Sequence, residues 1–75
     1  MKELLEYLAK SLVDSPDEVT VSQVEGERSL ILELRVAPDD MGKVIGKQGR
    51  IAQALRTIVK AAAVKDGKRV MIEII

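Results

Sequence analysis

Helical and strand periodicities alternate along the 75 residues of this chain, so its fold must combine helices with strands. From Lys2 to Val13 the apolar residues form one helical stripe, and the proline in Asp14–Asp17 cannot continue a helix. A second helix is predicted to open near Asp39, because proline followed by two carboxylates is typical of a first turn. A third stripe runs from Ile51 to about Val64 and ends at Asp66–Gly67, since glycine accepts the positive φ of a helix end.

Three other segments follow the pattern of strands. Glu18–Val24 is rich in β-branched residues, and a short loop around Gly26 separates it from Ser29–Val36, so the two predict a hairpin. Lys68–Ile75 alternates apolar residues with others and predicts a further strand. The predicted order is helix, strand, strand, helix, helix, strand. This is an α+β fold with one sheet under helices, in a single domain spanning residues 1–75.

The chain contains neither cysteine nor histidine, and this narrows its chemistry. The chain therefore lacks the usual ligands of zinc and copper sites, and it has no thiol or imidazole for covalent or proton-transfer catalysis. The serines and carboxylates form no recognisable catalytic constellation, so we expect no enzyme and no cofactor. The lack of cysteine favours a reducing compartment, and hence the cytoplasm. The longest apolar run, Ala61–Val64, is far too short to span a membrane.

Only one residue, Tyr7, is aromatic, so the core must be built from Leu, Ile, Val and Ala. A core of this size supplies roughly 3 to 5 kcal/mol, and self-association would add to it. We therefore expect a dimer. The same lack of aromatic rings argues against nucleic-acid-binding surfaces that stack bases on aromatic side chains, such as RRM and OB folds.

Charge is divided unevenly along a chain that is neutral as a whole. Residues 1–40 carry four basic and ten acidic side chains, a net charge of −6, and residues 41–75 carry eight and two, a net charge of +6. Such an asymmetry favours an anionic partner, with nucleic acid as the usual candidate. The alternative is that the two halves neutralise one another through internal ion pairs.

The densest motif is GKVIGKQGR, residues 42–50, between two predicted helices. Gly46 and Gly49 frame a short loop whose backbone can approach another molecule closely, and the N-terminus of the next helix attracts anions. Lys47 adds a positive charge. The simpler reading is that the glycines only turn the chain. A P-loop and a dinucleotide fingerprint both fail, because the glycine spacing differs and no strand directly precedes the loop.

The segment Val44–Gly49 resembles the VIGxxG core of KH domains, whose GxxG loop clamps about four nucleotides of backbone. Combined with this loop, the order αββααβ is similar to the type II KH arrangement. The whole chain is similar to the small bacterial KhpA family of RNA-binding proteins. The resemblance covers essentially all 75 residues and implies a three-stranded mixed sheet with helices packed on one face.

The resemblance also implies a function and a site. It implies a non-catalytic protein that grips single-stranded RNA through the GxxG loop, as a dimeric RNA chaperone or post-transcriptional regulator. The implied partners are single-stranded RNA, a second copy of the chain and a larger KhpB-type protein that contains a KH domain. The expected RNA-binding residues are the loop, its basic flanks and the neighbouring apolar positions: Lys43, Val44, Ile45, Gly46, Lys47, Gln48, Gly49, Arg50 and Ile51.

Alternatives stay open for some of these assignments. The apolar site residues, and the Leu34–Val36 end of the preceding strand, have the spacing of an ordinary core as well as of a groove wall. Arg56 and Lys60 lie a turn apart, either as a track for phosphates or as a solvated helix face. For the whole protein, the alternative function is a protein-protein adaptor that dimerises and contacts RNA only secondarily.

Overall fold

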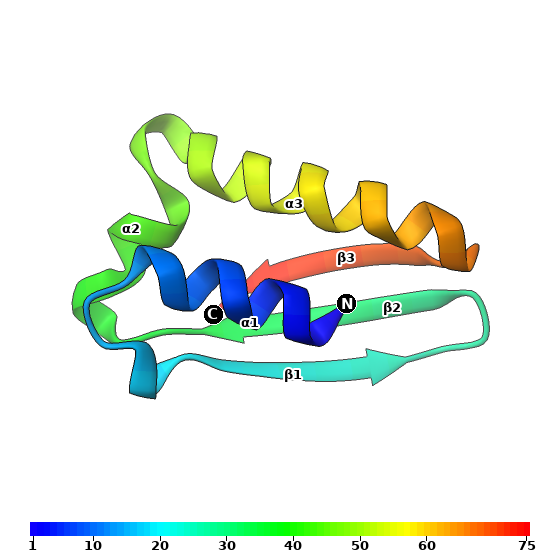
Figure 1. Ribbon diagram of the computed structural model, residues 1–75, viewed down its shortest axis with the longest axis horizontal. Helices are drawn as coiled ribbons and strands as arrows, with labels where there is room; N and C mark the ends of the chain where they lie inside the picture. The colour runs from blue at the N-terminus through cyan, green and yellow to red at the C-terminus, as the bar shows by residue number, and fades with distance from the viewer.

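A three-stranded sheet covered by helices forms the structure, a computed structural model that describes residues 1–75 except for the side chain of Asp66. Its helices and strands are α1 (Lys2–Leu12), β1 (Thr20–Glu25), β2 (Ser29–Arg35), α2 (Met41–Ile45), α3 (Arg50–Ala63) and β3 (Arg69–Ile74) (Figure 1). Short 3-10 turns occupy Pro16–Glu18, Pro38–Asp40, Lys47–Gly49 and Val64–Asp66. The predicted α+β class and the order αββααβ are confirmed.

The sheet has the strand order β1-β2-β3. The β1–β2 hairpin is antiparallel, with Val21 opposite Leu34, while β2 and β3 are parallel, with Leu30 opposite Val70. The predicted mixed sheet is therefore confirmed. Because side chains alternate between the two faces of a strand, these residues all point to one face, and they are all buried.

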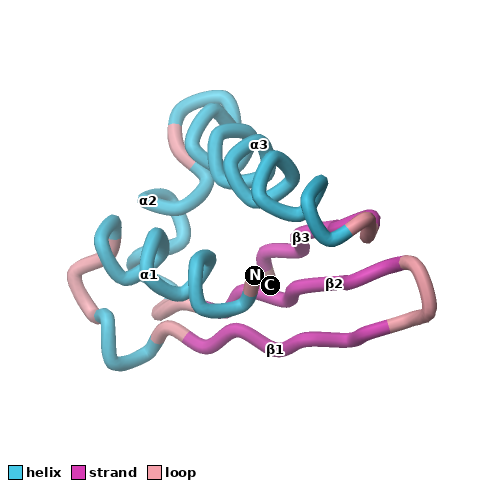
Figure 2. The backbone as a smooth tube through the Cα atoms, turned by 45° about the vertical axis from the view of Figure 1, so that its right-hand side comes forward, coloured by secondary structure: helices cyan, strands magenta, loops and turns pink.

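The helices all lie on that face of the sheet, as Figures 1 and 2 show from two directions. α1 packs over β1 and α3 packs over β3. Each helix presents one apolar stripe to the sheet, with Leu5 on α1 and Val59 on α3 among the fully buried residues. These side chains close over Leu32 and Leu34 of the central strand, so the core lies between the helical layer and one face of the sheet.

The structure corrects some predicted boundaries. β1 begins at Thr20 rather than Glu18, because Pro16–Glu18 forms a 3-10 turn. The segment Pro38–Asp40 is likewise a 3-10 turn, and α2 itself starts at Met41. Proline presets φ for a first turn, and short 3-10 turns are frequent at helix ends.

The opposite face of the sheet is not covered by helices (Figure 2). The strand register places Val24, Ile31 and Met71 in one row across this open face, and Val24 and Met71 are exposed. Elsewhere on the fold, none of the helices among the described residues is long and apolar enough to cross a membrane.

Candidate nucleic-acid interface

The connection between α2 and α3 is a tight turn in which three residues have positive φ. Gly46 has φ 75° and ψ 175°, Gln48 has φ 57°, and Gly49 has φ 73° and ψ 15°. The Gly49 N–H donates to the Gly46 carbonyl at 3.2 Å, which holds the turn closed. The side chains of Lys47 and Gln48, at the tip of this turn, are exposed.

The two glycines of the turn have different surroundings. A Cβ added to Gly46 would lie 2.5 Å from Cγ1 of Ile51, so this position is packed against the first turn of α3. A Cβ added to Gly49 would meet no atom within 4 Å. Gly46 therefore serves the packing of the turn itself, whereas the space beside the Cα of Gly49 is open.

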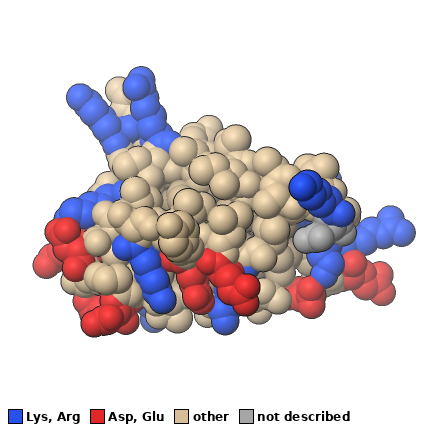
Figure 3. Space-filling view, in the orientation of Figure 1, with Lys and Arg blue, Asp and Glu red and all other residues tan. Residues whose placement is uncertain are grey.

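Basic side chains project from the end of the molecule where α2 joins α3 (Figure 3). Lys47 and Arg50 are exposed there, and neither forms an ion pair with another described residue. The first turn of α3 contains no acidic residue, and no side chain caps the N-terminus of this helix. The positive end of the helix dipole and two unpaired cations thus share one corner, which suits a phosphate.

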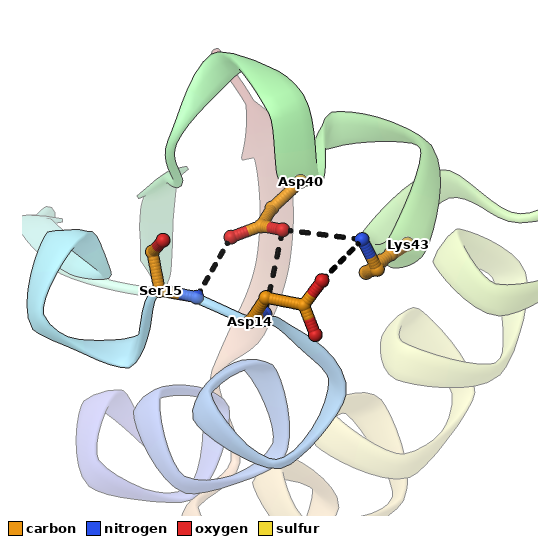
Figure 4. Close-up of polar contacts among 4 residues, drawn as sticks. All are labelled: Asp14, Ser15, Asp40 and Lys43. Carbon is orange, nitrogen blue, oxygen red and sulfur yellow. Dashed lines mark hydrogen bonds and ion pairs between the residues drawn. The ribbon is translucent and has the colours of Figure 1, made fainter.

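Lys43, which is also predicted to bind RNA, pairs with two carboxylates. Its Nζ lies 2.9 Å from Oδ2 of Asp14 and 3.4 Å from Oδ1 of Asp40 (Figure 4). Two carboxylates therefore balance its single charge. The contact joins α2 to the segment that follows α1, so Lys43 helps to position the helix that leads into the turn.

Asp40 is the centre of this cluster and is only 2% exposed. Its Oδ2 accepts the Ser15 N–H at 3.0 Å and its Oδ1 accepts the Asp14 N–H at 3.3 Å. Burial by itself raises the pKa of Asp40, but the two amide hydrogen bonds and the Lys43 ammonium outweigh burial, so the pKa lies below its ordinary value. The hydrogen bond to Asp14, together with the carboxylate charges, raises the pKa of Lys43.

The apolar site residues divide between core and surface. Val44 and Leu34 are fully buried, and Val36 is nearly so. These three residues therefore belong to the core. Ile45 is exposed, and Ile51 is half-buried beneath Gly46. Only the latter two lie where a bound strand could touch them.

An apolar groove runs between α1 and α3 on one side of the turn. It is a hollow of about 370 Å³, lined by Leu8, Ser11, Leu12, Arg50, Ile51, Ala54, Leu55 and Ile58. Two of its residues are well exposed for apolar side chains, Leu12 at 37% and Ile58 at 45%. This groove was not part of the predicted RNA site.

Comparisons with known proteins cover the chain along its whole length. A family model described as KhpA/KhpB, KH domain matches residues 2–74. RNA-binding protein KhpA of Clostridium acetobutylicum is 75% identical over 75 residues, which cover 100% of both chains. RNA-binding protein KhpA of Clostridium perfringens is 68% identical with the same coverage. Among solved structures, a crystal structure of an Aquifex aeolicus Era variant bound to GDP and aluminium fluoride matches with a TM-score of 0.67. The match covers 97% of this chain and 28% of that chain, and at 20% sequence identity it shows a likeness of fold.

Proposed function

The chain belongs to the KhpA/KhpB KH-domain family, and we propose that it is a cytoplasmic, non-catalytic protein that binds single-stranded RNA through the turn Gly46–Gly49. One observation carries the proposal. The exposed Lys47 and Gln48 stand on a glycine-framed turn directly before the uncapped N-terminus of α3. Relatives along the full length of the chain bear the name RNA-binding protein KhpA, which supports RNA as the ligand.

The chemistry of the turn fits the backbone of RNA better than its bases. A phosphate beside Gly49 is close to the α3 N-terminus and to Lys47 and Arg50, which supply positive charge. The Gln48 amide offers both donor and acceptor to a ribose 2′-hydroxyl. The turn itself has no aromatic ring to stack a base, since the one aromatic residue of the chain, Tyr7, lies in α1. Binding should therefore be strongly salt-dependent and weakly sequence-specific, as suits an RNA chaperone or a post-transcriptional regulator.

Reversing two charges at the turn tests this function. For single-stranded nucleic acid, each phosphate contact contributes about 0.7 to the steepness with which log K falls as log salt rises. Each contact therefore raises the association constant about fivefold when the salt concentration is lowered from 1 M to 0.1 M. We expect Lys47→Glu/Arg50→Glu to bind a short single-stranded RNA at least about 25-fold more weakly near 0.1 M salt. Fluorescence anisotropy titrations at two salt concentrations measure this loss.

The matched control is Lys2→Glu/Lys10→Glu, which makes the same charge change on exposed positions of α1. Circular dichroism checks that all variants fold. A glutamate at position 50 favours the helix dipole, so the turn variant should keep its stability. If the folded turn variant binds as tightly as wild type, or if the control loses as much, the turn is not the RNA site.

We further propose that the chain forms a homodimer through the apolar groove between α1 and α3. The groove exposes Leu12 and Ile58, and a core of roughly 3 to 5 kcal/mol gains from additional burial. Ile58 lies on the side of α3 away from Gly49 by helical spacing, so a partner centred on Ile58 leaves Lys47 and Gln48 free. Arg50 also lines the groove, so it lies at the border between the partner and the turn. The KH domain of a larger KhpB-type protein is the corresponding heteromeric partner.

Placing a charge in the groove should break the dimer. We expect Ile58→Asp to be a folded monomer at concentrations where wild type is a dimer, because a carboxylate cannot be buried unpaired in an apolar interface. Light scattering at several concentrations measures the mass, with Thr57→Asp on the exposed neighbouring position as control. A wild type that is monomeric throughout, or an Ile58→Asp variant that stays dimeric, would refute this interface.

A further inference from the structure

A second basic region lies at the opposite end of α3 from the turn. There a hollow of about 430 Å³ opens between the end of α3 and the start of β3, and it is lined by Lys60, Val64, Gly67, Lys68, Arg69 and Val70. We call it the basic hollow. Basic side chains are also visible at this end of the molecule in Figure 3. Residues 56–70 contain five basic side chains and one acidic one, so the charge here is strongly positive.

The chain reversal after α3 creates the basic hollow. α3 ends at Ala63, a 3-10 turn follows at Val64–Asp66, and Gly67 reverses the chain with φ 68°. The Gly67 N–H donates to the Val64 carbonyl at 3.2 Å, which fixes the reversal. The first residues of β3 are thereby brought back beside the last turns of α3, next to Lys60.

One side of α3 joins the turn at Gly46–Gly49 to the basic hollow. Gly49, Gln53, Arg56 and Lys60 are spaced by four, three and four residues, so they follow one side of the helix. The other side, which includes Ile58, faces the groove against α1. Arg56 is half-buried and Lys60 exposed, and neither pairs with an acid among the residues the structure describes.

The charge of the basic hollow is only partly balanced. The Lys68 ammonium forms an ion pair with Glu25, and the hydrogen bond and charge of Lys68 lower the pKa of Glu25. Lys60 and Arg69 have no such partner among the described side chains. Among the side chains that the structure describes here, one carboxylate faces three cations, and this surplus of positive charge can be neutralised by an anion.

From this geometry we propose that the basic hollow is a second phosphate-binding subsite, which holds the same RNA strand after it has passed along α3 from the turn. This inference rests on the proposed function. With 14 residues, α3 is about 21 Å long, at about 1.5 Å per residue. A GxxG loop clamps about four nucleotides, so the subsite engages only strands that extend beyond the segment held at the turn.

Removing positive charge from the basic hollow should therefore weaken the binding of long strands but not of short ones. We expect Lys60→Gln/Arg69→Gln to bind a strand of about twelve nucleotides roughly 5- to 25-fold more weakly near 0.1 M salt, with the salt slope reduced by about 0.7 to 1.4. Binding of a strand of about four nucleotides should stay unchanged. The control Lys2→Gln/Lys65→Gln removes two charges from positions that do not line the hollow, one of them just after α3.

The outcomes separate this subsite from the proposed function. If the hollow variant binds the long strand as wild type does while Lys47→Glu/Arg50→Glu binds neither strand, the subsite is wrong and the turn stands. If the control variant weakens as much as the hollow variant, only diffuse charge is involved and the subsite is also wrong. If wild type binds neither strand, the proposed function fails and the subsite with it.

Discussion

Alanine at Gly46 is expected to destabilise the protein by about 3 kcal/mol, whereas alanine at Gly49 should cost about 1 kcal/mol. With φ 75° and ψ 175°, Gly46 lies in a region that is essentially restricted to glycine, and a Cβ there would also overlap Ile51. Gly49, with φ 73° and ψ 15°, has a left-handed conformation and open space around it. Urea denaturation of the two single variants measures the difference.

Asparagine at the same two positions provides a second comparison. Asparagine tolerates the left-handed region, so Gly49→Asn should be close to wild type in stability, while Gly46→Asn should be as damaging as alanine. Equal losses at the two positions would contradict the different surroundings described for them. The result also decides which variants can test RNA binding, because a substitution at Gly46 alters the fold of the turn as well as its surface.

Removing the Asp40 carboxylate should be the other severe change. We expect Asp40→Ala to lower the melting temperature by about 5 to 20 °C, because two backbone N–H groups and the Lys43 ammonium lose their common acceptor. The neighbouring Asp39→Ala is the matched control, since Asp39 is exposed and accepts no hydrogen bond from another described residue. Thermal unfolding followed by circular dichroism compares them, and similar melting temperatures would contradict the role assigned to Asp40.

The pKa of Asp40 gives this contribution a characteristic pH dependence. A carboxyl group whose pKa is lowered on folding stabilises the folded state above its unfolded pKa of about 3.9, and this stabilisation is lost as pH falls through the folded pKa. The stability gap between wild type and Asp40→Asn should therefore narrow on acidification below about pH 4. A gap that stays constant into strong acid would mean that ionisation of Asp40 does not contribute.

Periodicity was sufficient to predict α1, β2, α3 and β3 and the face that each of them buries. Leu30, Leu32 and Leu34 alternate with other residues along β2, and all three are buried as a half-covered strand requires. The same reasoning predicted α3, whose stripe includes Leu55 and Val59. Such patterns are visible in a single sequence because they depend on neighbours only one to four residues apart.

Contacts between distant segments could not be predicted in this way. Asp40 was read as part of a helix start, but its carboxylate accepts hydrogen bonds from Asp14 and Ser15, about 25 residues earlier in the chain. Lys43 was expected at an RNA surface for its charge, and only the fold shows that Asp14 and Asp40 balance it. Similarly, the GxxG spacing does not reveal that Gly46 is packed against Ile51 and that Gly49 is open.

Mapping bound RNA onto the backbone amides tests the central claim most directly. In a ¹H–¹⁵N correlation titration of the wild-type chain with a short single-stranded RNA, the largest shifts should fall on Gly46–Gly49 and Arg50. The amides of Val24, Ile31 and Met71 on the open face of the sheet should stay in place. Shifts concentrated on that open face, with the amides of the turn unmoved, would show that RNA binds elsewhere and would contradict the function proposed for the turn.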